Sequence, residues 1–97
     1  MHAAYIKRGG IQYVMWDLTN YQVNPPITSA AVSIDNQVTW HTAEVVNDNL
    51  VRILCAHPET DTPGNALVLL PTKTEFELKL NDNPEIIVRD AGTVWLE

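Results

Sequence analysis

The sequence predicts an all-β domain, an antiparallel β-sandwich of about seven or eight short strands. Two observations support this prediction. Apolar and polar residues alternate with a period of two, most clearly over residues 75–81, where Phe76, Leu78 and Leu80 share one face. Turn-forming residues also interrupt the β-rich runs at intervals of roughly ten residues, which is typical of small all-β domains.

Residues 1–10 are expected to form an N-terminal arm, and residues 11–97 a single β-sandwich domain. The arm contains Tyr5 and Ile6 but has no periodic apolar face of its own. A chain of 97 residues suits one core, because single domains usually contain about 50 to 200 residues.

The stretch after the arm is rich in strand-forming residues. Residues 11–18 are dominated by apolar, aromatic and β-branched side chains, which favour a strand. Asn24-Pro25-Pro26 should then interrupt regular structure, since proline fixes its own backbone angle. Residues 30–34 and 37–40 flank the polar pair Asp35-Asn36, and this pattern predicts a hairpin.

Residues 42–56 allow two interpretations. Ala43, Val46 and Leu50 lie near helical spacing, so one helix over 42–56 is conceivable. The run Asn47-Asp48-Asn49 opposes a helix, because these side chains compete for backbone hydrogen bonds. We therefore prefer two strands, at about 43–46 and 50–56, joined by a polar turn.

Further strands are expected in the C-terminal part of the chain. A loop over residues 57–65 precedes them, and Asp82-Asn83-Pro84 should form a turn. Asp90-Ala91-Gly92 should separate the last two strands. The expected strands cover residues 66–70, 75–81, 85–89 and 93–96.

The charge balance argues against nucleic acids and membranes as partners. Six Lys and Arg face twelve Asp and Glu, for a formal net charge of −6. Proteins that bind phosphate backbones or anionic lipids carry basic patches, and the only adjacent basic pair here is Lys7-Arg8. The sequence also lacks the run of about 18 apolar residues that a membrane helix requires.

The cysteine content and the N-terminus lead to an expectation about location. Cys55 is the only cysteine, so no disulfide can form within the chain. The first residues lack the basic head and apolar core of a secretory signal. We expect a protein that is made in a reducing cytoplasm.

Residues with catalytic or metal-binding chemistry are few, and each has a structural explanation. His57, Glu59 and Asp61 could ligate a metal, but a solvated loop is the preferred interpretation. Cys55 with His57 or His41 could form a nucleophile and base, although a lone cysteine in an apolar strand is usually buried. We expect no catalytic residue, no cofactor and no metal.

Paired carboxylates and tryptophans are the remaining candidates. Glu75 and Glu77 share a strand face and could do acid–base work, but alternation with apolar residues favours a solvated sheet face. Trp16 and Trp40 are expected in the core. If Val94 and Leu96 face inward, alternation points Trp95 outward, where it could anchor a partner.

Eight segments carry a resemblance to a known family: Tyr5-Ile6-Lys7-Arg8-Gly9, Val38-Thr39-Trp40, Ala43-Glu44-Val45-Val46, Leu50-Val51-Arg52-Ile53-Leu54, Asp61-Thr62-Pro63-Gly64, Val68-Leu69-Leu70-Pro71, Asp82-Asn83-Pro84-Glu85 and Ala91-Gly92-Thr93-Val94. Their order resembles small β-sandwich proteins from the virions of tailed bacteriophages, especially phages of actinobacteria. It is also similar to the N-terminal β-sandwich domains of longer phage baseplate proteins, which begin with a comparable Lys/Arg-Gly segment. The immunoglobulin pattern of two cysteines around a tryptophan is absent, so the predicted sandwich is immunoglobulin-like in architecture only.

The resemblance implies a non-enzymatic component of a virion, and the small acidic chain suits a capsid decoration (cement) protein. The implied partners are the major capsid protein or other virion proteins, and a homo-oligomer is expected, with a trimer as one option. The candidate partner contacts are Tyr5, Ile6, Lys7, Arg8 and Trp95. The alternatives are a tail, connector or baseplate component, or a module that binds carbohydrate or protein on a host surface through Tyr13, Tyr21 or Trp95.

Overall fold

The computed structural model describes residues 4–18, 27–47, 49–82 and 85–97. This part of the chain contains strands and no helix, which confirms the predicted all-β class, and none of it could cross a membrane as a helix. The strands are β1 (Ala4–Ile6), β2 (Ile11–Asp17), β3 (Ser29–Ser33), β4 (His41–Val46), β5 (Leu50–Ala56), β6 (Leu67–Val68), β7 (Lys73–Asp82) and β8 (Glu85–Leu96).

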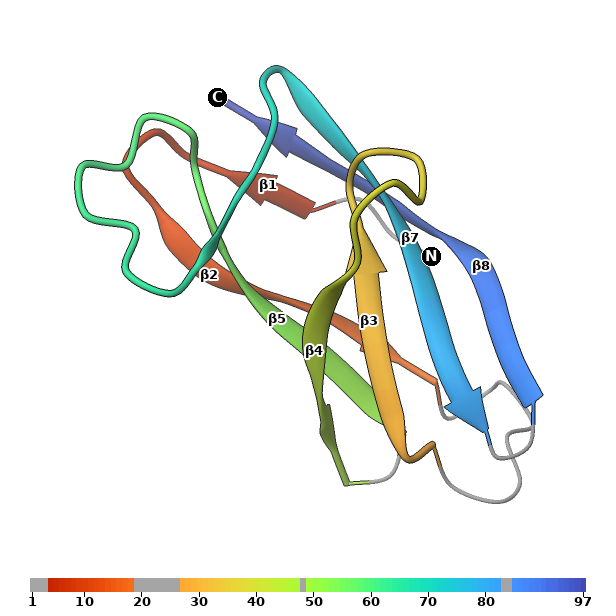
Figure 1. Ribbon diagram of the computed structural model, residues 1–97. Helices are drawn as coiled ribbons and strands as arrows, with labels where there is room; N and C mark the ends of the chain where they lie inside the picture. The colour runs from red at the N-terminus through yellow and green to blue at the C-terminus, as the bar shows by residue number, and fades with distance from the viewer. Residues whose placement is uncertain (1–3, 19–26, 48, 83–84) are drawn as a thin grey trace.

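The strands form one continuous path that nearly closes into a barrel (Figure 1). The order is β1-β8-β7-β3-β4-β5-β2, with β6 beside β5. The pairs β1–β8 and β5–β6 are parallel, whereas the other pairs are antiparallel. The sheet is therefore mixed, and the predicted antiparallel, immunoglobulin-like sandwich is not confirmed.

Strand β4 changes neighbours along its length. Its first half pairs with β3, as in the Ala43–Ala30 pair. Its second half pairs with β5, beginning at the Glu44–Arg52 pair. Figure 1 shows β4 crossing between these two neighbours. As a result β4 connects the two sides of the molecule and diverges from the C-terminal half of β5.

The core follows the alternation that the sequence predicts. Phe76, Leu78 and Leu80 of β7 are buried together, and Trp16 of β2 is buried opposite them. The rings of Trp16 and Phe76 make an edge-to-face contact with centroids 5.3 Å apart. Trp16 Nε1 donates a hydrogen bond of 2.7 Å to the Ala91 carbonyl oxygen, which satisfies its one polar group.

Trp40 differs from its prediction as a core residue. It precedes β4, is only half-buried, and lies with Lys79 Nζ 4.4 Å from the centre of its ring. The quadrupole of an indole ring attracts a cation held over its face, and this attraction does not require the ring to be buried. Trp40 thus packs against the outside of the sheet.

The middle of the chain forms two strands, β4 and β5, and the helical alternative is excluded. Asn47 in the turn between them has a φ of 52°, a left-handed conformation that asparagine tolerates better than most residues. Asn47 and Asn49, two members of the polar run that opposed a helix, thus lie where the chain reverses.

The predicted hairpin around Asp35 has only one of its two strands. Residues 34–40 form a loop, because local side-chain bonds replace the ladder. Ser33 Oγ accepts a bond from the Gln37 N–H, and Asp35 Oδ1 accepts one from the Thr39 N–H, both at 2.9 Å. The hydrogen bond from the Thr39 N–H makes the largest contribution to lowering the pKa of the Asp35 carboxyl, and the hydrogen bond from the Ser33 hydroxyl makes the next largest.

The C-terminal strands differ in length from those predicted. The expected strand over 66–70 contracts to β6, and the two expected strands over 85–89 and 93–96 are one strand, β8. Gly92 has a φ of 87°, and the β7–β8 register shifts between Glu75 and Glu77. A bulge of this kind lets a strand continue through residues that resemble a turn. The predicted interruption at Asn24-Pro25-Pro26 and residues 83–84 of the predicted turn lie outside the described residues.

Candidate interaction site

Two of the predicted partner contacts, Tyr5 and Trp95, are neighbours on adjacent strands. The parallel β1–β8 register places Tyr5 opposite Trp95, and paired residues project from the same face of a sheet. Their exposed fractions are 56% and 44%. The flanking residues Val94 and Leu96 face inward and are buried. The outward orientation predicted for Trp95 is therefore confirmed.

A third strand extends this face. Lys73 at the start of β7 pairs with Trp95, and its Nζ atom lies 5.4 Å from the centre of the Trp95 ring. Lys73 Nζ also lies 3.5 Å from Glu75 Oε1. We call the outward row of Tyr5, Trp95 and Lys73 the terminal aromatic surface. Sequence reasoning missed Lys73, because only the strand register reveals that it is next to Trp95.

Ile6 is not available to a partner. Its exposed fraction is 0%, and it pairs with the buried Leu96. Alternation along β1 points Tyr5 outward and Ile6 inward, so Ile6 belongs to the core. The predicted contact at Ile6 is corrected accordingly, and residues 4–6 of the predicted arm form a strand of the sheet.

Lys7 and Arg8 lie in the tight turn that joins β1 to β2. The Gly10 N–H donates a 2.9 Å bond to the Lys7 carbonyl, and Gly9 has the φ of 80° that suits the third residue of a type II turn. Both basic residues are exposed. Arg8 Nε pairs with Glu59 at 2.8 Å, which ties the turn to the loop after β5.

His57 contacts backbone atoms of the turn, of the loop and of the C-terminus. Its N–H donates to the Gly10 carbonyl at 3.0 Å, its Nδ1 accepts from the Glu59 N–H, and its Nε2 lies 3.0 Å from the Glu97 carbonyl oxygen. Since a carbonyl only accepts, these contacts assign the ring proton to Nε2. Both ring nitrogens have partners in the backbone, which supports a structural role for His57.

Cys55 is part of the core. Its side chain is completely buried, and burial raises the pKa of the thiol from 9.0 to about 12. The predicted burial of Cys55 is confirmed, and a thiol with so high a pKa is a poor nucleophile near neutral pH. Within the described ranges, no group of three or more His, Cys, Asp or Glu side chains could hold a metal ion.

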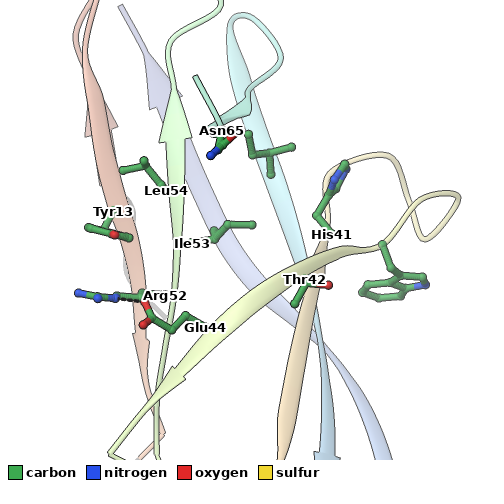
Figure 2. A pocket seen from close by; sticks show the side chains of 10 residues that line it. Tyr13, His41, Thr42, Glu44, Arg52, Ile53, Leu54 and Asn65 are labelled. Atoms are coloured by element: carbon green, nitrogen blue, oxygen red, sulfur yellow. Dashed lines mark hydrogen bonds and ion pairs between the residues drawn. The ribbon is translucent and has the colours of Figure 1, made fainter. Parts of the chain in front are cut away.

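A second exposed site lies on the other side of the molecule. A groove of about 500 Å³ opens where β4 diverges from β5 (Figure 2). Its lining includes Tyr13, Glu44 and Arg52, of which the sequence singled out only Tyr13. Tyr21, also considered for carbohydrate binding, lies outside the described residues.

No protein-family model matches the chain, and neither a curated protein nor a solved structure shows significant similarity to it.

Proposed function

We propose that this protein is a non-enzymatic structural protein that attaches to a larger protein assembly through the terminal aromatic surface. The observation that carries the proposal is the pairing of Tyr5 with Trp95 on adjacent strands, with about half of each side chain exposed. Large rigid aromatic side chains are enriched among the anchors of protein interfaces. Lys73 beside Trp95 adds a donor that suits a polar rim.

The assembly proposed here is the capsid of a tailed bacteriophage, on which the protein acts as a decoration protein that bridges and stabilises capsomers. This step rests on the resemblance of the sequence to small virion proteins. A compact acidic domain with an exposed aromatic row is suited to such a role, since many weakly bound copies gain avidity on a repeating lattice.

The fold proposed for this role is an immunoglobulin-like sandwich with two layers. Two features support it: β1, β8, β7 and β3 pair in that order, and β2 and β6 each pair with β5. Strand β4 would then pass from the first layer to the second. Such a sandwich places the terminal aromatic surface on the outside of the first layer.

The test compares two single substitutions by co-sedimentation with capsids of the phage that encodes the chain. Trp95→Ala should weaken binding by tenfold or more, the order expected for loss of an interface anchor. Tyr13→Ala is the matched control, since Tyr13 has an exposed fraction of 45% against 44% for Trp95 but lies on β2. Equal binding of Trp95→Ala and wild type would contradict the proposal.

The number of copies per particle separates the head from the tail. Quantitative gel densitometry of purified virions should give hundreds of copies for a decoration protein. A dozen copies or fewer would favour a connector or baseplate position, and absence from the particles would contradict a role in the virion altogether.

A truncation is a poor test of the proposal. Removal of residues 1–8 would delete the buried Ile6 together with the exposed Tyr5. It would also remove the β1–β8 pairing, and hence disturb the strand that carries Trp95. Point substitutions at exposed positions avoid this confusion.

A further inference from the structure

Strand β2 pairs with β5 along its whole length, but the opposite edge of β5 is shared by β4 and β6, which leave a gap between them. The groove between β4 and β5 opens at this gap. Strand β4 pairs with β5 up to the Glu44–Arg52 pair, and β6 begins at the Cys55–Leu67 pair. Thr42, which the register would place opposite Leu54, pairs instead with Ala31 of β3. Figure 2 shows the resulting space, with Thr42 on one side and Leu54 on the other.

The position of Leu54 in the ladder directs its backbone N–H into this space. Successive residues of a strand direct their backbone groups to opposite edges. The Asn49 carbonyl accepts a hydrogen bond from the Leu18 N–H, and the His57 N–H donates one to the Gly10 carbonyl, so both residues bond toward β2. The Ala56 carbonyl accepts from the Leu69 N–H on the opposite edge of β5. Leu54 shares the orientation of Ala56. Among the described residues, the ladder therefore gives the Leu54 N–H no partner.

Next to this donor, three side chains are held in a fixed arrangement. Arg52 Nε donates to Glu44 Oε1 at 2.5 Å, and the Arg52 guanidinium lies 4.3 Å from the centre of the Tyr13 ring. The hydrogen bond to Glu44 raises the pKa of Arg52 above its ordinary value. Among the described residues, the hydrogen bond between Glu44 and Arg52 uses the Arg52 Nε–H, so the terminal amino groups of Arg52 are available as donors beside the groove.

Trp40, Ile53, Leu54 and Leu67 also line the groove, but the surface that it exposes is mostly polar and its charge is balanced. His41, Thr42 and Asn65 add groups that donate and accept hydrogen bonds, and the Glu44–Arg52 pair carries one charge of each sign. A simple anion gains little from Arg52, because Glu44 already compensates its charge. An apolar ligand would leave the polar groups without partners. The volume of about 500 Å³ falls within the range of roughly 300 to 1,000 Å³ typical of small-molecule sites.

We propose that this groove binds a neutral saccharide of one or two rings. Vicinal sugar hydroxyls both donate and accept, so one hydroxyl can donate to Glu44 while its neighbour accepts from Arg52 or from the Leu54 N–H. The exposed part of Tyr13 offers an aromatic surface to the C–H face of the ring. The inference does not depend on the proposed function, since the groove and the terminal aromatic surface involve different residues.

The test is a titration of the ¹⁵N-labelled full chain, followed by amide chemical shifts. The probes are glucose, galactose, mannose, N-acetylglucosamine, maltose and cellobiose, with acetate and glucuronate as charged comparisons, each up to about 50 mM. At least one neutral sugar should shift the amides of Leu54 and its groove neighbours saturably, and should slow hydrogen exchange of the Leu54 amide. No saturable shift with any neutral sugar, or tighter binding of acetate and glucuronate, would overturn the inference.

Variants then assign the binding to the groove. Arg52→Lys keeps the charge but loses the planar donor fork, and should weaken binding roughly tenfold, the effect of one hydrogen bond to a charged group. Tyr13→Leu should weaken it as well, whereas Trp95→Ala should bind the sugar like the wild type. Binding that is lost in Trp95→Ala and retained in Arg52→Lys would place the sugar elsewhere and contradict the inference.

Discussion

The terminal aromatic surface and the groove between β4 and β5 each contain an aromatic side chain of nearly equal exposure, in very different surroundings. Trp95 lies in an outward row across three strands that remain paired, with Tyr5 on one side and Lys73 on the other. Tyr13 lies beside a point where the sheet divides, next to the Glu44–Arg52 pair. A continuous sheet face suits another protein surface, whereas an interrupted ladder offers polar groups to a small ligand.

The comparison also shows which parts of the molecule the two sites share. Both rest on one core, in which Trp16 connects β2 to β8 through its bond to the Ala91 carbonyl. The contacts that His57 makes with the turn and the C-terminus lie next to β1 and the end of β8, the strands that carry Tyr5 and Trp95. Substitutions should therefore affect both sites, or one, according to which contacts they remove.

The largest effect is expected for Trp16→Ala. It removes a buried ring, the contact with Phe76 and the bond to Ala91, and should lower the free energy of unfolding by about 3 to 5 kcal/mol. Urea denaturation measures this loss. The milder Trp16→Phe keeps most of the ring and should cost less, and a Trp16→Ala protein as stable as the wild type would contradict the described core.

The next largest effect is expected for His57→Leu. It leaves the Glu59 N–H and the Glu97 carbonyl without their side-chain partner, and should lower the free energy of unfolding by about 1 to 3 kcal/mol. The amide chemical shifts of residues near Tyr5, Gly10 and Trp95 should differ from those of the wild type, and that of Leu54 should stay unchanged. Shifts spread equally over both sites would show that the comparison between them is wrong.

A smaller, pH-dependent effect is expected at Cys55. The unfolded thiol ionises near its ordinary pKa of 9.0, whereas the folded thiol keeps its proton until the pH approaches about 12. The contribution to stability is therefore present below pH 9 and is lost as the pH rises from 9 toward 12. Between pH 9 and 12, the free energy of unfolding of Cys55→Ala should therefore fall less than that of the wild type. Urea denaturation at several pH values measures this difference.

Alkylation of Cys55 provides the companion measurement. Iodoacetamide at pH 8 should label the unfolded chain quickly and the native protein slowly, because the thiol is buried and protonated. Equal rates of labelling in the two states would contradict its place in the core.

The smallest effect on stability is expected at the Glu44–Arg52 pair. Both side chains are partly exposed, so a double-mutant cycle of Glu44→Gln and Arg52→Gln should give a coupling of only about 0.2 to 1 kcal/mol. Sugar binding should respond more strongly than stability to the same substitutions. A coupling of several kcal/mol would mean that the pair serves the fold more than the groove.

The sequence predicted the fold class and much of the core, because alternation directly encodes which residues face inward. Phe76, Leu78 and Leu80 illustrate this, as does the outward orientation of Trp95. It did not predict the parallel β1–β8 pairing, since residues 4–6 form too short a strand to show a period. For the same reason the sequence predicts Ile6 as a partner contact, although its side chain belongs to the core.

The candidate sites were less predictable than the core. Lys73 and Trp95 are far apart in the sequence, and only the β7–β8 register makes them neighbours. The Leu54 donor depends on where β4 diverges from β5, which is a property of tertiary structure with no local sequence signal. Trp40 shows the reverse error, since a strand-rich context suggested burial while Lys79 covers its ring on the surface.

The most direct test of the central claim is a cryo-electron microscopy map of the virion at side-chain resolution. The account predicts density for this chain on the capsid, with Tyr5 and Trp95 buried against a neighbouring protein and Tyr13 still open to solvent. A map in which this chain is bound but Tyr5 and Trp95 face solvent, or in which no such chain is present, would contradict it.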